Sequence, residues 1–85
     1  MSERIIKIGR VEMYESDVKR LYTERKYVVT SYAIYQIMYS QAQATFYGQK
    51  VSDIKGMARR GRFYTLTASE INHVLGYEYL AEDIY

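Results

Sequence analysis

The chain has 85 residues, no cysteine, no proline and a formal net charge of +2 at pH 7. This length predicts a single domain over residues 1–85, and the missing cysteine excludes disulfides and thiolate metal sites. A single histidine excludes a multi-histidine zinc site, and the sequence has no EF-hand loop. We therefore expect no metal and no cofactor.

The N-terminal segment has two short runs typical of β-strands, at residues 5–8 and 11–14, with Gly9 and Arg10 between them. A two-residue Gly-X link predicts a β-hairpin; the alternative is one strand with a bulge at Gly9. Charged residues on both sides of the first run are not typical of a secretory signal. We therefore expect a cytoplasmic protein.

An amphipathic helix is predicted over residues 17–26. Ser16 is the expected N-cap, and apolar residues then recur at helical spacing, at Val18, Leu21 and Tyr22. The charged residues of this segment have both signs, which indicates a solvated face.

Residues 27–49 contain no Asp, Glu, Lys or Arg. Their many Ser, Thr and Gln residues exclude a membrane span, and aromatic residues at 3–4 spacing predict a central helix over residues 31–47 that ends at Gly48. This helix either fills the middle of the monomer or packs one face on a second copy. The second alternative predicts a homodimer or larger oligomer, with an interface made of Tyr32, Tyr35, Gln36, Tyr39, Gln43 and Phe46.

Residues 50–62 form a basic block of net charge +4. We predict a helix over residues 53–60, and then a strand over residues 62–67 that could join the N-terminal hairpin. Arginines hold phosphates and aromatic rings stack on bases, so the candidate ligand- or nucleic-acid-binding residues are Lys55, Arg59, Arg60, Arg62, Phe63 and Tyr64. The alternative is a basic face neutralised by the acidic tail of the same or a neighbouring chain.

The C-terminal part begins with the sequence Thr-Ala-Ser-Glu at residues 67–70, which has the spacing of a capping box. It predicts a helix over residues 68–75 that Gly76 ends. The acidic residues 77–85 follow as a tail or short helix. A helix-turn-helix would need its recognition helix in this tail, and the absence of any cation there argues against that motif.

The predicted fold is a single-domain, mainly helical α+β protein with four helices and a small N-terminal β-hairpin or strand. Neither His73 nor the Glu82–Asp83 pair belongs to a recognisable catalytic set, so we expect no enzymatic activity. The first functional hypothesis is a small regulator or inhibitor that binds a protein and itself; the alternative is a nucleic-acid- or nucleotide-binding module. In size, tyrosine content and lack of cysteine the chain resembles small phage-encoded regulators.

Overall fold

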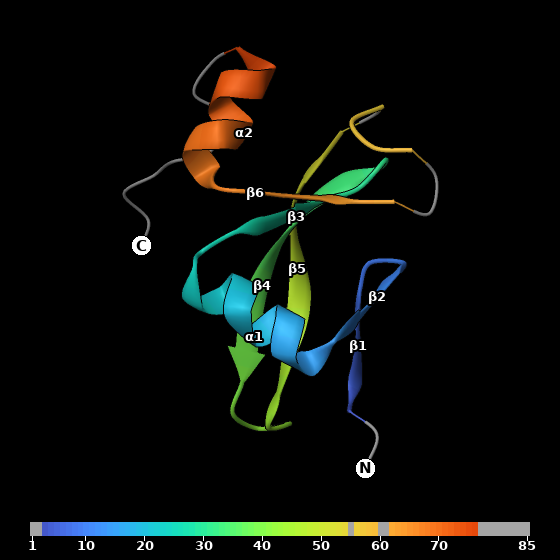
Figure 1. The fold of residues 1–85 in the computed structure, drawn as a ribbon, viewed down its shortest axis with the longest axis vertical. Helices are drawn as coiled ribbons and strands as arrows, with labels where there is room; N and C mark the ends of the chain where they lie inside the picture. The colour runs from blue at the N-terminus through green and yellow to red at the C-terminus, as the bar shows by residue number, and fades with distance from the viewer. Residues whose placement is uncertain (1–2, 55, 60–61, 77–85) are drawn as a thin grey trace.

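The computed structural model describes residues 3–54, 56–59 and 62–76. These residues form two helices and six strands (Figure 1). In chain order the elements are β1 (Ile5–Ile8), β2 (Val11–Tyr14), α1 (Glu15–Thr23), β3 (Tyr27–Val29), β4 (Ala33–Ser40), β5 (Thr45–Asp53), β6 (Tyr64–Leu66) and α2 (Ala68–Leu75).

The prediction of a mainly helical fold with four helices is wrong. The expected central helix over residues 31–47 is instead the antiparallel pair β4 and β5, joined by a turn at residues 41–44. Tyrosine, isoleucine and phenylalanine favour strands when they find cross-strand partners, and the glutamine and alanine residues between them supply the turn. In that turn Ala44 takes a left-handed φ of 52°. The 3–4 spacing of the aromatic residues was therefore a misleading signal.

The main sheet has four antiparallel strands in the order β5-β4-β3-β6. Of its two inner strands, β4 has eight residues and β3 has three. A bulge interrupts the β4–β5 register between Ile34 and Tyr35. The predicted strand at residues 62–67 does exist in part as β6, but it pairs with β3 and not with the N-terminal hairpin as expected.

The N-terminal hairpin of β1 and β2 is confirmed, with Ile8 opposite Val11 across the Gly9–Arg10 turn. Gly9 has a φ of 64°, which glycine adopts without strain. A Cβ atom on Gly9 would lie 2.8 Å from the Tyr35 ring, so the hairpin tip sits directly on β4. The tip of the hairpin is therefore fixed by its packing on the main sheet.

Gly48 lies within β5 and does not end a helix, as the sequence had suggested. A Cβ atom there would lie 2.7 Å from a methyl carbon of Ile8 and 3.3 Å from the Ile8 Cα atom. The missing side chain lets β1 pack directly on β5.

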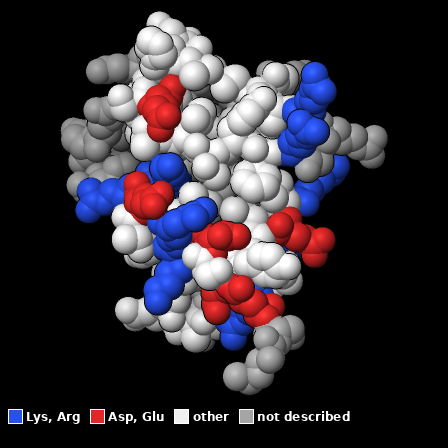
Figure 2. Space-filling view, in the orientation of Figure 1, with Lys and Arg blue, Asp and Glu red and all other residues white. Residues whose placement is uncertain are grey.

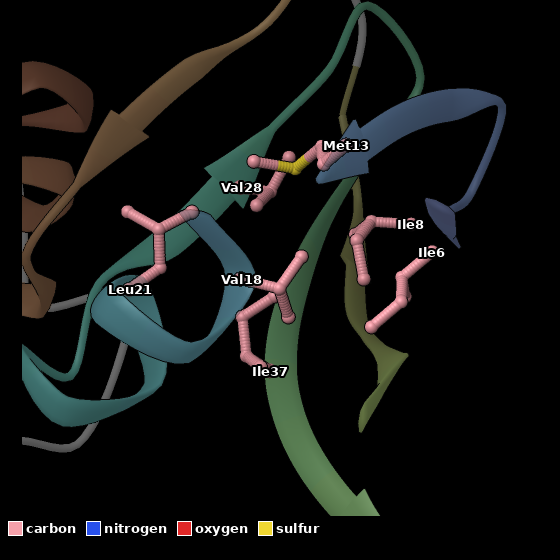
Figure 3. Close-up of a cluster of buried hydrophobic side chains, with 7 residues drawn as sticks. All are labelled: Ile6, Ile8, Met13, Val18, Leu21, Val28 and Ile37. Carbon is pink, nitrogen blue, oxygen red and sulfur yellow. The ribbon is translucent and has the colours of Figure 1, made fainter. Parts of the chain in front are cut away.

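Two buried clusters lie on opposite faces of the sheet, because successive side chains of a strand alternate between faces. Val28 of β3 joins the first cluster, whereas its neighbours Tyr27 and Val29 join the second. The first cluster lies between the sheet, α1 and the hairpin (Figure 3). The second lies under α2, where Ile71 is fully buried.

Helix α1 begins two residues earlier and ends three residues earlier than predicted, and Ser16 is not its N-cap. Instead, the Ser16 N–H donates to the Glu3 carboxylate at 2.6 Å. Hydrogen bonds from the Ser16 side chain and, to a smaller extent, from its backbone N–H lower the pKa of Glu3 below its usual range. A distant side chain thus supplies the anionic partner that a helix N-terminus favours.

The capping box at α2 is confirmed: the Thr67 hydroxyl accepts from the Glu70 N–H at 3.2 Å, and the Glu70 carboxylate accepts from the Thr67 N–H at 3.0 Å. That second bond is the main reason that the pKa of Glu70 is lowered. Gly76 ends α2 with a left-handed φ of 79°. Both signals are local in sequence, so both could be predicted.

The predicted basic helix over residues 53–60 is absent from the described part of this segment, because β5 extends to Asp53 and residues 56–59 are irregular. Lys55, Arg60 and Gly61 lie outside the described residues, as does the acidic tail at residues 77–85. Neither of the two described helices is long and apolar enough to cross a membrane.

Candidate functional site

Two connections meet at one end of the main sheet. Val29 at the end of β3 lies opposite Tyr64 at the start of β6, and Ala33 at the start of β4 lies opposite Asp53 at the end of β5. The turn between β3 and β4 therefore lies beside the connection between β5 and β6. Two hydrogen bonds join them, from the Ile54 N–H to the Tyr32 carbonyl at 2.8 Å and from the Gly56 N–H to the Ser31 carbonyl at 3.3 Å.

Thr30 fixes the conformation of the β3–β4 turn. Its buried hydroxyl donates to the Ala33 carbonyl at 2.9 Å and accepts from the N–H groups of Tyr32 and Ala33 at 3.2 and 3.0 Å. Threonine commonly builds such local turns through its side chain. The result is a rigid turn that presents the Tyr32 ring to solvent with 57% of its surface exposed.

Arg10 reaches this turn from the tip of the N-terminal hairpin. Its guanidinium carbon lies 5.6 Å from the centroid of the Tyr32 ring, within the range of a cation–π contact. The packing of Gly9 on Tyr35 holds the hairpin tip in place. A cation and an aromatic ring that are 22 residues apart in sequence are thus placed side by side.

The connection between β5 and β6 supplies two more arginines. Its apolar residues Ile54 and Met57 pack against the second core cluster, and Ala58 is buried. Arg59 and Arg62 remain exposed, joined by a hydrogen bond of 3.0 Å from the Arg62 N–H to the Arg59 carbonyl. We call the surface formed by Arg10, Tyr32, Arg59 and Arg62 the basic end.

Among the residues that the structure describes, the arginines of the basic end have no acidic partner. The nearby Lys50 ammonium is paired with Asp53 at 2.9 Å, and this hydrogen bond raises the pKa of Lys50. Within the part of the chain that the structure describes, the other three cations of this region, Arg10, Arg59 and Arg62, form no ion pair. Figure 2 shows Lys and Arg at the upper right edge with acidic side chains just below them, and mixed signs over α1.

The structure separates the six predicted binding residues. Arg59 and Arg62 belong to the basic end, whereas Lys55 and Arg60 lie outside the described residues. Tyr64 is 52% exposed at the start of β6. Phe63 lines a different surface, a hollow of about 350 Å³ beside the hairpin residues Met13 and Tyr14.

The six predicted interface residues do not share one face. Tyr35 and Phe46 pack against the first core cluster, and Gln36 is half-buried in β4. Tyr39 is exposed and contacts Phe46 edge-on, with ring centroids 4.9 Å apart. The remaining two lie in turns, Tyr32 before β4 and Gln43 after it. This dispersion follows from the strand geometry that replaced the predicted helix.

Sequence reasoning missed Arg10 and Thr30 as parts of the site. Arg10 was read only as half of a hairpin turn, although a hairpin tip is a place where a side chain can reach a neighbouring element. Thr30 shapes the connection between β3 and β4, in a segment where the sequence predicted the start of a helix. Tyr32 was assigned to an oligomer interface. No local signal connects these residues, because their proximity depends on the packing of the hairpin on β4.

Comparisons with protein-family models, with curated proteins and with solved structures found no match to this chain. Over residues 3–54, 56–59 and 62–76, no group of three or more His, Cys, Asp or Glu side chains is arranged to hold a metal ion.

Proposed function

We propose that this protein binds single-stranded nucleic acid at the basic end, and that it acts by binding alone. The observation that carries the proposal is the Arg10 guanidinium over the exposed Tyr32 ring. Beside it lies a connection whose Arg59 and Arg62 form no ion pair with any residue that the structure describes. Guanidinium groups recognise phosphates, and an exposed aromatic ring can stack on an unpaired base. A cytoplasmic location belongs to the same proposal.

The proposal favours a single strand over a duplex for a geometric reason. The aromatic side chains at this end, Tyr32 and Tyr64, are both more than half exposed. Bases inside a duplex are already stacked on each other, whereas bases of a single strand can stack on protein rings. The guanidinium groups of Arg10, Arg59 and Arg62 supply the attraction to the phosphate backbone.

The test is fluorescence anisotropy with labelled single-stranded DNA and RNA of mixed sequence, at several salt concentrations. We expect the affinity to fall steeply with salt, because bound phosphates release counterions. The double variant Arg59→Ala/Arg62→Ala should lower the magnitude of the log–log slope by about 1.4, since each lost phosphate contact in a single strand accounts for about 0.7.

The matched control removes two cations from α1, in the double variant Lys19→Ala/Arg20→Ala. Both residues are exposed, and Arg20 lies near Asp17. This control has the same change in net charge and should leave the slope close to that of the wild type. Absence of binding, or equal slopes for the two double variants, would sink the proposal.

A second candidate function is a small regulator or inhibitor that binds another protein. The uncharged surface of β4 and of β5 up to Gln49 favours it, because depletion of charge and the presence of tyrosine are typical of protein interfaces. The two candidates differ in their salt dependence. Binding through the uncharged surface should change little with salt and should be insensitive to Arg59→Ala/Arg62→Ala.

A further inference from the structure

Strand β4 has one open edge along half of its length. On one side it pairs with β5 from Ala33 to Ser40. On the other side β3 reaches only Ile34, Tyr35 and Gln36. Among the described residues, no strand therefore pairs with residues 37–40 on that side. An unpaired strand edge presents backbone N–H and C=O groups that can pair with another strand.

A hollow of about 560 Å³ lies beside this open edge. The end of α1 forms one wall through Leu21 and Tyr22, and β4 forms the other through Ile37 and Met38. Neighbouring strands of a sheet are about 4.8 Å apart, so an added strand needs free space next to the edge. The hollow provides that space. Its apolar residues provide a surface for the side chains of the added strand, and its other lining residues are Thr23, Arg25, Lys26 and Gln36.

The open edge lacks the features that usually prevent strands from pairing between molecules. Natural edge strands carry lysine, proline or a bulge. Residues 37–40 include no charged residue and no proline. The bulge lies outside them, earlier in β4, between Ile34 and Tyr35. The turn that follows, at residues 41–44, is also uncharged.

We propose that two copies of this chain pair antiparallel through residues 37–40 of β4 and form a two-fold dimer. A two-fold contact brings identical surfaces together, and like charges opposite each other destabilise a strand pair. A charged edge would oppose itself, whereas residues 37–40 carry no charge. The Lys26 ammonium beside them is paired with the Glu24 carboxylate at 3.6 Å. The inference does not depend on nucleic-acid binding.

The symmetry of the dimer limits its register. Residues directly opposite in an antiparallel pair share a face of the sheet, and a two-fold axis through the sheet preserves the faces. One residue must therefore lie opposite its own counterpart. Within the open edge the candidates near the centre are Met38 and Tyr39, which point to opposite faces because they are neighbours in a strand.

The natural absence of cysteine makes this register testable with single-cysteine variants of the full chain. Met38→Cys or Tyr39→Cys places two thiols on the axis, at a Cα separation compatible with a disulfide. Tyr14→Cys is the matched control, since Tyr14 is an exposed strand tyrosine away from β4. Under mild oxidation we expect Met38→Cys or Tyr39→Cys to form a covalent dimer at least about tenfold faster than the control. Equal rates for all three variants would overturn the proposed pairing.

The wild-type chain provides a second test that needs no substitution. Pairing over four residues is a small interface, so the dissociation constant should be micromolar or weaker. Sedimentation velocity between about 1 µM and about 1 mM should show a monomer–dimer equilibrium, and Ser40→Lys should shift it towards monomer by adding an edge lysine. A monomer throughout that range, or a dimer that Ser40→Lys leaves unchanged, contradicts the inference.

Discussion

The surface of α1 and the basic end differ in how their charges are compensated. Around α1, Arg4, Arg20 and Lys26 lie 3.7, 3.8 and 3.6 Å from acidic partners. At the basic end, Arg10, Arg59 and Arg62 have no ion pair within the described part of the chain. The net charge of +2 conceals this contrast. This contrast shows that the surface suited to a polyanion is identified by where the charges lie and not by the net charge of the chain.

The two regions also differ in what lies beneath them. Helix α1 covers the first core cluster, in which Val18 and Leu21 are almost fully buried. The basic end consists of turns whose arginines and tyrosines are mainly solvent-exposed. Substitutions under α1 should therefore change stability and leave binding intact, and substitutions at the basic end should do the reverse.

The largest expected effect is on stability under α1. Leu21→Ala should lower the free energy of unfolding by about 2–5 kcal/mol, because it leaves a cavity in the first core cluster. Thermal unfolding followed by circular dichroism measures this change. If the variant does not fold, Val18→Ala removes less side chain and gives a milder version of the test. An unchanged unfolding temperature in both variants would contradict the packing of α1.

The next effect is on binding at the basic end. Tyr32→Ala should weaken single-strand binding by roughly 5- to 150-fold, which corresponds to the loss of one stacked base at about 1–3 kcal/mol. Because Tyr32 is exposed, the free energy of unfolding of the Tyr32→Ala variant should differ from that of the wild type by no more than about 0.5 kcal/mol. Tyr32→Phe keeps the ring and should retain most of the affinity. Equal affinity of the wild type and of Tyr32→Ala for single strands would contradict a role of the Tyr32 ring in binding.

A smaller effect is expected at α2, which belongs to neither region. Thr67→Ala removes the hydroxyl that accepts from the Glu70 N–H, and loss of a helix cap costs about 1 kcal/mol. The unfolding temperature should fall by about 4–8 °C. Nucleic-acid affinity should stay unchanged, and a parallel loss of affinity would mean that α2 contributes to binding.

The acid dependence of stability should show a further, smaller effect. The pKa of Glu70 is lowered in the folded protein, mainly by the hydrogen bond from the Thr67 N–H. Its stabilising contribution is therefore present above the unfolded-state pKa of about 4.3 and is lost as the pH falls through the lower folded-state pKa. Glu70→Gln should reduce the acid-induced drop in unfolding temperature below about pH 4.3 without abolishing it, because the pKa of Glu3 is also lowered. An identical drop in both proteins would contradict this role.

The smallest effect is expected for an ion pair on α1. Arg20 and Asp17 are exposed partners one helical turn apart, and such pairs contribute about 0.3–0.5 kcal/mol. Arg20→Ala should therefore barely change either the unfolding temperature or the affinity for single strands. If Arg20→Ala lowered the affinity as much as substitution of an arginine at the basic end, the proposed difference between the two regions would be wrong.

Local signals in the sequence predicted the N-terminal hairpin and both ends of α2. Gly9 permits the turn, and the capping hydrogen bonds at Thr67, Glu70 and Gly76 join residues that are a few positions apart. Long-range partners were beyond such signals. Glu3 caps α1 across 13 positions, and Tyr64 of β6 pairs with Val29 and not with the hairpin. In the site, the arginines of the basic block were predicted, whereas Arg10 and Thr30 were not.

The sequence by itself determined where charge is absent, where it concentrates and where the chain can turn. The tertiary structure alone decided that the predicted helix over residues 31–47 is replaced by β4 and the start of β5. Aromatic and β-branched residues are stable in a strand only when a neighbouring strand pairs with them. The tertiary structure also brought Arg10 over Tyr32 and left part of β4 without a β3 partner. These arrangements depend on packing between distant segments, which no short stretch of sequence encodes.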